Sequence, residues 1–226
     1  MNAAVPSPFL QSLLGRDALT AEVRGAVDPA TLYQEDWRFL TGARLRRIEQ
    51  FAAGRLCARR ALADLGLLAC ALAVNPDRTP RWPEEVVGSI THTTDYCAAA
   101  VARRSEFHAI GIDAEREAAV TLDLRSLFCT RAERAALERL STTAAVRRLA
   151  VLFSAKEAFY KCQYPLCGEW IDFADVELEL DEATGVFEVQ PLRPILLTAR
   201  HPGPWRGKAC VSDGLVLSAV AIRVGA

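Results

Sequence analysis

The sequence predicts a mixed α/β (α+β) fold of two lobes, with the functional site at their junction. The chain has 226 residues, of which 51% are hydrophobic, so it can bury the core of one large domain or of two small ones. Each half runs from a helical pattern into strand patterns, although no sequence repeat of about 20 to 50 residues accompanies this order. Ligand clefts often form where two such lobes meet.

In the first half, one long helix is followed by a loop and by strands. Apolar residues recur at helical spacing through residues 42–65, and Gly66 follows where a helix C-terminus favours glycine. The prolines within residues 75–83 predict a loop. Residues 88–102 become apolar again and alternate weakly, which predicts strands around residues 93–95.

The second half begins with a buried strand, and its longest helix follows later in the sequence. The apolar run through residues 107–115 predicts the strand, and the helical spacing of apolar residues predicts a helix over residues 144–162. Two short helices are expected between them, at residues 122–129 and 131–140. Three β segments should follow, of which the first two form a hairpin, at residues 176–180, 185–189 and 215–224.

Charge, hydropathy and cysteine content exclude several classes of protein. Lys and Arg number 27 against 28 Asp and Glu, and the resulting net charge of -1 argues against bulk binding to nucleic acid. The longest apolar run, residues 65–74, is far shorter than the ~20 residues of a membrane helix, and residues 1–15 lack the positive start of a secretory signal. The seven cysteines and three histidines show no zinc-ligand spacing. We therefore expect mostly buried, reduced thiols in a cytoplasmic protein.

Two short segments carry the chemistry that a metal and a phosphate would need. The first is Gly-Ile-Asp-Ala-Glu at residues 111–115, where Asp113 and Glu115 should share one face of the strand. The second is Phe-Ser-Ala-Lys-Glu-Ala-Phe-Tyr-Lys at residues 153–161, where Glu157 and Lys161 lie one helical turn apart. Carboxylates from two elements make a hard oxygen site suited to Mg²⁺ with substrate phosphates, which the lysine could help to neutralise.

These charges also have ordinary interpretations. Asp113 and Glu115 could line a solvated strand edge, and Glu157 with its lysines could form surface ion pairs worth only about 0.3–0.5 kcal/mol. The surrounding sequence is nearly all apolar, however, and charged groups in such surroundings are costly unless they are paired or bound to a ligand.

Three basic residues of the first half are candidates for an anion site. His92 ends the segment Gly-Ser-Ile-Thr-His; a lone histidine is usually structural, but its small hydroxylated neighbours could line an anion site together with backbone N–H groups. Arg55 and Arg59 lie one turn apart on the predicted helix, and such a pair can clamp one phosphate, although solvated arginines are the simpler interpretation.

Taken together, these segments resemble the 4′-phosphopantetheinyl transferases of the surfactin-synthetase and enterobactin-synthetase type. Four matches occur in order between about residues 47 and 170: the Gly-Arg helix at residues 51–62, the Pro-Arg-Trp-Pro and Gly-Ser-Ile-Thr-His segments, and the two acidic segments. The resemblance implies a pseudo-twofold pair of α/β lobes, each with a helix on a small, mostly antiparallel sheet. It also implies a monomer with coenzyme A (CoA) in the cleft. Residues 1–111 would form the lobe that contacts the CoA nucleotide, and residues 112–226 the lobe with the metal site and the pyrophosphate contacts.

The resemblance also assigns roles to individual residues. Asp113, Glu115 and Glu157 would hold Mg²⁺, or alternatively Mn²⁺, against the CoA pyrophosphate. Asp113, Glu157 and Lys161 would be the catalytic group. The remaining implied CoA contacts are Arg47, Arg55, Arg59, Arg78, His92 and Lys156, with Lys161 shared between both sets.

The implied reaction transfers the phosphopantetheine arm of CoA to a serine of an apo acyl or peptidyl carrier protein, with release of 3′,5′-ADP. Glu157, directly or through a water molecule that it orients, would take the serine proton. The carrier could bind to a basic rim formed by the arginine-rich helix or to an apolar patch near Leu127 and Phe128. We expect a role in secondary metabolism and no nucleic-acid or membrane partner. Two alternatives remain open: a Mg²⁺-dependent CoA hydrolase and a non-catalytic CoA- or nucleotide-binding regulator.

Overall fold

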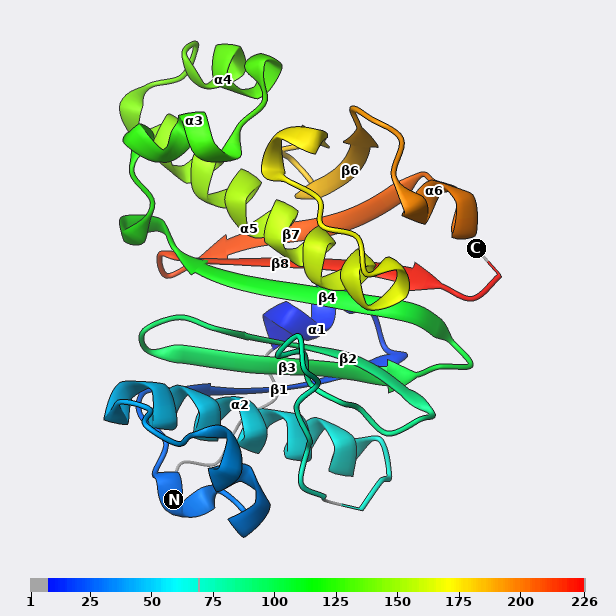
Figure 1. The fold of residues 1–226 in the computed structure, drawn as a ribbon. Helices are drawn as coiled ribbons and strands as arrows, with labels where there is room; N and C mark the ends of the chain where they lie inside the picture. The colour runs from blue at the N-terminus through cyan, green and yellow to red at the C-terminus, as the bar shows by residue number, and fades with distance from the viewer. Residues whose placement is uncertain (1–7, 69, 226) are drawn as a thin grey trace.

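The computed structural model describes residues 8–68 and 70–225, and it consists of two helix-covered antiparallel sheets that meet along one edge of each (Figure 1). The predicted two-lobed α+β fold is confirmed. Residues 1–7 and 69 belong to the stretches considered above as a secretory signal and as the longest apolar run, and they lie outside the described residues, as does residue 226. Within the described ranges, no helix is both long and apolar enough to cross a membrane.

The first lobe is a three-stranded sheet in the order β1-β3-β2, covered on one face by α2. Small residues along α2 and β3, many of them alanine, let the helix lie close to the sheet. The glycine predicted to follow the long helix does so: Gly66 has a φ of +82°, and Leu67 N–H donates to the Leu62 carbonyl at 2.9 Å. The elements up to the end of β3 are α1 (Pro8–Leu14), which packs against β8 and β7 of the second sheet as well as against β1, then β1 (Ala18–Arg24), η1 (Pro29–Thr31), η2 (Gln34–Phe39), α2 (Leu45–Asp64), β2 (Val86–His92) and β3 (Tyr96–Arg103).

The second lobe is a five-stranded sheet in the order β4-β8-β7-β6-β5, covered by the long helix α5. The predicted hairpin and the predicted final strand are confirmed as β5–β6 and β8. The elements after the first lobe are β4 (Phe107–Arg116), η3 (Glu117–Ala119), η4 (Leu122–Leu124), α3 (Arg125–Phe128), α4 (Arg131–Leu137), α5 (Thr142–Cys167), η5 (Phe173–Asp175), β5 (Val176–Leu180), β6 (Val186–Pro191), α6 (Leu196–Arg200), β7 (Trp205–Ser212) and β8 (Leu215–Arg223).

The two sheets meet where β2 lies beside β4, and two hydroxyl side chains make the junction. Ser89 Oγ accepts a hydrogen bond from Ile112 N–H at 3.1 Å, and Thr91 Oγ1 accepts one from Ala114 N–H at 3.0 Å. These hydroxyls satisfy backbone donors at the edge of β4 that have no strand partner on this side. Thr91 also donates its own hydrogen to Asp113 Oδ1, whereas the Ser89 hydroxyl still has a hydrogen to donate, so the anion site expected at these residues stays a prediction.

The change from one sheet to the other occurs in the turn before β4. The predicted boundary at residue 111 falls inside β4, all of which pairs with β8 in the second sheet. The division of nucleotide and pyrophosphate contacts between the lobes stays a prediction. The predicted thiol state agrees with the structure, since all seven cysteines are free and Cys57, Cys97, Cys129 and Cys162 are buried.

Replacing Gly111 with alanine is expected to destabilise the protein strongly. A β-carbon at residue 111 would lie 1.9 Å from the Ala158 carbonyl oxygen and 2.5 Å from Cys162 N, so α5 would have to move away from β4. Overpacking of this kind typically costs about 1–3 kcal/mol, and more where the obstacle is backbone. Thermal unfolding measures the loss, with Gly54→Ala as the matched control, because a β-carbon there first meets the movable Ile90 side chain at 3.2 Å. Equal melting temperatures for the two variants would contradict this account of the contact.

Candidate active site

The acidic residues of β4 and α5 come together at the junction of the lobes. Asp113 is buried, and its Oδ1 accepts hydrogen bonds from Lys161 Nζ at 2.6 Å and from Thr91 Oγ1 at 3.1 Å. Lys161 therefore points from α5 toward the carboxylates of β4, as the helical spacing predicted. The bond from Thr91 also ties β2 to this cluster, so both lobes contribute to it.

The carboxylates of this cluster disfavour each other's charge. The pKa of Glu115 is raised to about 7: burial is the largest cause, the Asp113 and Glu157 charges add to the rise, and Lys161 opposes it. Burial likewise raises the pKa of Glu157, which Lys161 lowers and Asp113 raises. One lysine thus faces three carboxylates, and the local excess of negative charge favours the binding of a cation.

The donor set fits a hard divalent cation. Carboxylates from two rigid elements are the ligands that Mg²⁺ uses beside substrate phosphates. Across the described residues, no three His, Cys, Asp or Glu side chains are already arranged around a single metal position. Asp113 instead holds Lys161, so metal binding would exchange this lysine for the cation at one carboxylate oxygen.

A row of positive groups continues from this cluster into the first lobe. Partial removal of solvent from the His92 ring lowers the pKa of the imidazole. The Arg47 and Lys161 charges also lower this pKa, and the Asp113 charge raises it. His92 therefore lies within electrostatic reach of both the carboxylate cluster and Arg47. The structure brings these residues together as predicted, in an arrangement suited to an anionic ligand.

Arg55 and Arg59 are buried rather than solvated, and they differ in how they are bound. Arg59 donates to Asp36 Oδ2 at 3.2 Å and to the Thr31 carbonyl at 2.6 Å, so its guanidinium is used inside the first lobe. The predicted CoA contact of Arg59 is therefore corrected to an internal one. No described residue forms a hydrogen bond with Arg55. Its pKa is lowered to about 10, mainly by burial; the Arg59 and Arg47 charges add to the fall, and the Asp36 charge opposes it.

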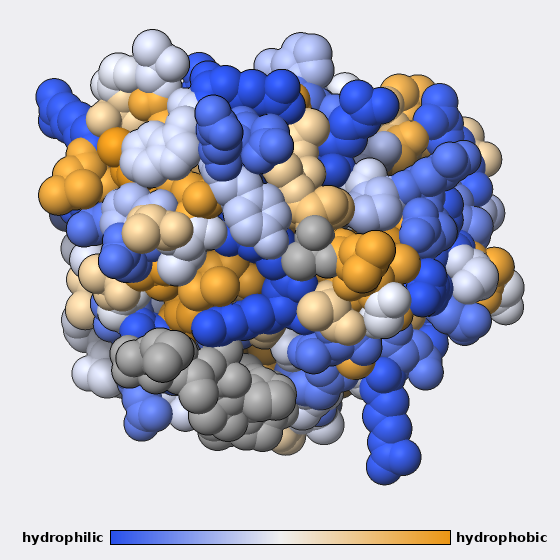
Figure 2. Space-filling model, turned by 90° about the horizontal axis from the view of Figure 1, so that it is seen from below, coloured by the Kyte–Doolittle hydropathy of each residue, from blue (hydrophilic) through white to orange (hydrophobic). Residues whose placement is uncertain are grey.

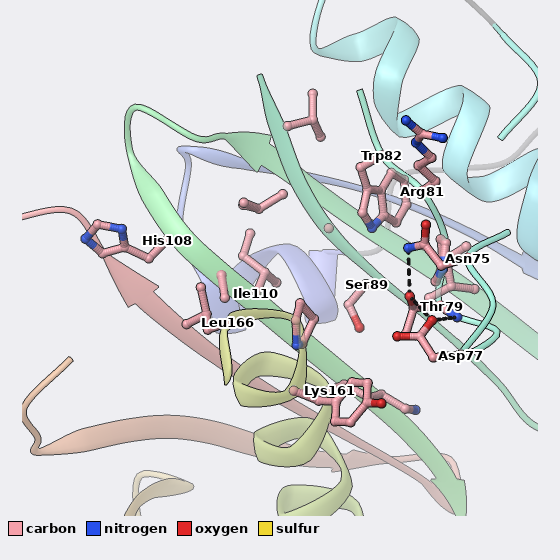
Figure 3. A pocket seen from close by; sticks show the side chains of 18 of the residues that line it. Asn75, Asp77, Thr79, Arg81, Trp82, Ser89, His108, Ile110, Lys161 and Leu166 are labelled. Atoms are coloured by element: carbon pink, nitrogen blue, oxygen red, sulfur yellow. Dashed lines mark hydrogen bonds between the residues drawn. The ribbon is translucent and has the colours of Figure 1, made fainter. Parts of the chain in front are cut away.

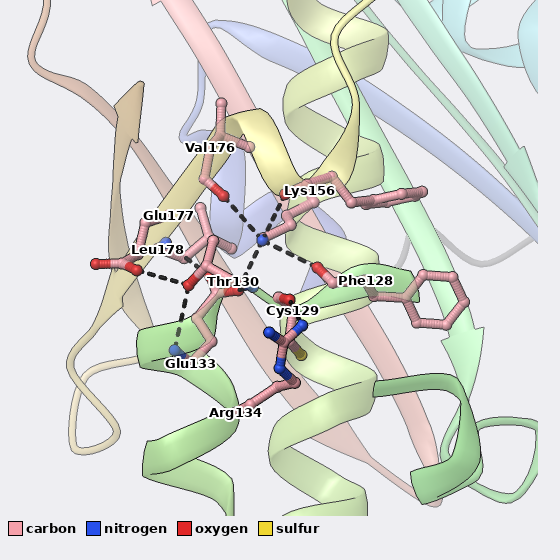
Figure 4. Close-up of polar contacts among 10 residues, drawn as sticks. Phe128, Cys129, Thr130, Glu133, Arg134, Lys156, Val176, Glu177 and Leu178 are labelled. Carbon is pink, nitrogen blue, oxygen red and sulfur yellow. Dashed lines mark hydrogen bonds and ion pairs between the residues drawn. The ribbon is translucent and has the colours of Figure 1, made fainter. Parts of the chain in front are cut away.

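The predicted CoA contact through the Lys156 amino group is wrong. Lys156 Nζ lies within hydrogen-bond distance of Glu133 Oε2, at 2.7 Å, and of three backbone carbonyls, at 2.8–3.0 Å, so its three N–H groups are all used, and the residue is only 2% exposed (Figure 4). Successive residues on a helix point in directions about 100° apart, so the Lys156 amino group points to other partners than the Glu157 carboxylate does. Its acceptors lie on α4, at the end of α3, in η5 and at the start of β5, which makes it an internal link of the second lobe. The three carbonyls belong to Phe128, Phe173 and Val176.

A cavity of about 600 Å³ lies between the lobes next to Lys161. Figure 3 shows Trp82, Ser89 and Lys161 around it, contributed by a loop, β2 and α5 respectively. Arg78, predicted as a CoA contact, lines this cavity from the loop, together with Arg81, which sequence reasoning missed. The cavity is large enough for a nucleotide-sized ligand.

A second cavity of about 440 Å³ adjoins Glu157 on the other side of Tyr160, which lines both cavities. Its walls are mainly apolar and aromatic, and they include Trp170 and Phe173. The sequence from residue 170 onward supplied no predicted site residue, yet it forms part of this wall. In the sequence, only the close spacing of Trp170 and Phe173 could have indicated this aromatic wall. Their position beside Glu157 depends on the path of the chain past α5.

Comparisons with known proteins place the sequence among one family. Residues 35–102 match a family model described as the 4′-phosphopantetheinyl transferase N-terminal domain, and residues 109–211 match that of the 4′-phosphopantetheinyl transferase superfamily. The chain is 36% identical to 4′-phosphopantetheinyl transferase Svp of Streptomyces mobaraensis, over 86% of this chain and 80% of the relative. It is 34% identical to Npt of Nocardia iowensis over 78% and 82% of the two chains. It is 31% identical to PptT of Mycobacterium tuberculosis over 94% and 96%.

Proposed function

The chain belongs to the 4′-phosphopantetheinyl transferase superfamily, and from this premise we propose its substrates and the roles of its residues. It transfers the phosphopantetheine arm of CoA to a serine hydroxyl of an acyl or peptidyl carrier protein, and 3′,5′-ADP leaves. The observation that carries the proposal is the charge pattern of the site. A carboxylate cluster with one lysine is followed by His92, Arg47 and the buried Arg55.

This pattern matches the two separate anionic groups of CoA. The pyrophosphate would lie at the carboxylate cluster, where a bound cation and Lys161 offset its charge. The 3′-phosphate would lie among His92, Arg47 and Arg55, where the Arg47 charge adds to the lowering of the pKa values of both His92 and Arg55 and so favours an anion. The cavity between the lobes would take the adenosine, with Arg78 on its loop wall.

Asp113, Glu115 and Glu157 would hold Mg²⁺, or Mn²⁺ in its place. When bound, the metal supplies neutralisation of the pyrophosphate and polarisation of its β-phosphorus. Lys161 stabilises the charge of the departing 3′,5′-ADP. Glu157, whose pKa is raised by burial, accepts the serine proton directly or through an oriented water. The serine oxygen forms a bond to the β-phosphorus while the bond from that phosphorus to the bridging oxygen breaks.

The apolar cavity beside Glu157 suits the uncharged pantetheine arm, and two surfaces near the site suit a carrier. Leu127, at 62%, and Trp170, at 73%, are strongly exposed close to that cavity. The alternative is the start of α2, where Leu45 is 64% exposed among exposed arginines. Figure 2 shows the face of the molecule on which α2 lies, with hydrophilic and apolar side chains interspersed. Carrier modification by variants of either surface would distinguish them. We further propose a cytoplasmic monomer that serves secondary metabolism.

Removal of divalent metal is expected to lower the transfer rate by at least about a hundredfold, because the pyrophosphate charge would then face three carboxylates and a single lysine. The measurement is the release of 3′,5′-ADP in the presence of an apo carrier, before and after chelation. Added Mg²⁺ should restore the rate, and Mn²⁺ should do so at least in part. A rate that chelation leaves unchanged would overturn the assignment of the carboxylates to a metal. CoA cleavage that proceeds without carrier modification would favour a hydrolase.

A further inference from the structure

We propose that Asp36 is a positioning residue that holds Arg55 toward the 3′-phosphate of CoA and thereby sets the preference of the enzyme for CoA over 3′-dephospho-CoA. This inference rests on the proposed function. Asp36 lies in η2, outside the segments that drew attention in the sequence, and it contacts none of the residues of the carboxylate cluster.

Asp36 is a fully buried carboxylate that is fixed from one side. Its exposed fraction is 0%, and its Oδ2 accepts bonds from Tyr33 N–H at 3.0 Å and from Arg59 Nη1 at 3.2 Å. Arg59 is in turn bound to the Thr31 carbonyl at 2.6 Å and lies 4.3 Å from the centre of the Tyr33 ring. The position of Asp36 is therefore determined by the chain around it, independently of Arg55.

The other oxygen of Asp36 faces Arg55. Asp36 Oδ1 forms no hydrogen bond with any described residue, and it lies 3.7 Å from Arg55 Nε, which is also buried without a hydrogen bond. The ring of Phe51 packs 4.2 Å from the guanidinium carbon of Arg55. A charged oxygen on one side and an aromatic ring on another restrict the orientations that the guanidinium can adopt.

The end of the Arg55 side chain is not fully enclosed, although the residue as a whole is only 4% exposed. Of its three guanidinium nitrogens only Nε is both fully buried and unbonded, so the two terminal nitrogens, which have no hydrogen bond to any described residue, still reach solvent. Arg55 thus has one edge toward Asp36 and a free edge available for a ligand. Arg47 lies near enough to lower the pKa of both Arg55 and His92, which places this free edge with the other cations of the site.

The excess of positive charge around Arg55 also favours the binding of an anion. Two buried guanidinium groups, those of Arg55 and Arg59, face the one carboxylate of Asp36, and burying such an excess of positive charge is costly. The exposed Arg47 adds a further positive charge near Arg55. A phosphate on the free edge of Arg55 would offset this excess. The Asp36 carboxylate offsets part of the charge of the two buried arginines, and the phosphate of the ligand would offset the remaining positive charge.

The test compares kcat/KM for CoA and for 3′-dephospho-CoA with the same apo carrier. Asp36→Asn should reduce the preference for CoA by about tenfold, the effect of one misplaced charge-assisted hydrogen bond. The loss should appear in the KM for CoA, while the KM for 3′-dephospho-CoA and both kcat values stay within about twofold. Glu35→Gln, which neutralises the exposed neighbouring carboxylate of η2, is the matched control and should keep the preference of the wild type.

A merely structural role would lower activity with both substrates alike, and an unchanged preference in Asp36→Asn would overturn the proposal. If Asp36→Asn does not fold, Asp36→Asn/Arg59→Gln removes the partner charge as well and is compared with Arg59→Gln alone. The preference should be lost in the double variant and kept in the single one; loss in neither would also overturn the proposal. Failure of the wild-type protein to modify any carrier with either substrate would count instead against the proposed function.

Discussion

Asp113→Ala is expected to lower carrier modification by at least about a thousandfold while the fold remains intact. Asp113 is the point where the elements of the site meet, since its Oδ1 binds both Lys161 of α5 and Thr91 of β2. The substitution removes one proposed metal ligand and also releases the lysine that would stabilise the leaving group. Losses of charge stabilisation in a reacting centre typically reach a hundred- to a thousandfold for a single donor, and here two effects combine.

The same loss is expected for Glu157→Ala, because this residue would both bind metal and accept the serine proton. Asp64→Ala, at the exposed end of α2, is the matched control and should keep full activity. Circular dichroism and the melting temperature establish that the variants are folded. Full activity of a folded Asp113→Ala or Glu157→Ala variant would refute the assignment of the site.

Lys156→Ala is expected to be the most destabilising of the substitutions considered, with a loss of about 3–5 kcal/mol. The variant would leave the Glu133 carboxylate buried without its cation, and it would remove a donor from the carbonyls of Phe128, Phe173 and Val176 (Figure 4). The expected fall in melting temperature is about 10 °C, since about 2–4 °C per kcal/mol is typical at this chain length.

The other lysine away from the site supplies the control. The Lys208 side chain has no hydrogen bond or ion pair with the residues that the structure describes, so Lys208→Ala should change the melting temperature little. Glu133→Gln/Lys156→Met removes both buried charges and should be more stable than Lys156→Ala, because no unpaired ion remains. A fall for Lys156→Ala no larger than that for Lys208→Ala would contradict the structural role.

The parts of the site that the sequence predicted depend on local geometry. Asp113 and Glu115 follow from the alternation of a strand, and Glu157 and Lys161 follow from one turn of a helix. The structure adds Gly111, whose missing side chain allows α5 to lie against β4 and brings these two local patterns into contact. The predicted long helices and the β5–β6 hairpin are likewise confirmed, because their apolar periodicity extends over many residues.

The errors concern side chains whose partners are distant in sequence. Lys156 pairs with Glu133 and Arg59 pairs with Asp36, in each case 23 residues away, and nothing in the spacing of either segment indicates these contacts. Strands β1 and β7 were missed because their burial patterns do not alternate regularly between buried and exposed residues. The bonds of the Ser89 and Thr91 hydroxyls to β4 were likewise not predicted, because they depend on β4 lying beside β2.

The central proposal, transfer of the CoA arm to a carrier serine, is tested most directly by the intact mass of a carrier protein. An apo carrier is incubated with the enzyme, CoA and Mg²⁺, and the same carrier with its target serine replaced by alanine is treated in parallel. The account predicts a gain of one phosphopantetheine group on the first carrier and none on the second. Unchanged masses across a panel of apo carriers, with CoA intact, would contradict the account and favour a protein that only binds CoA.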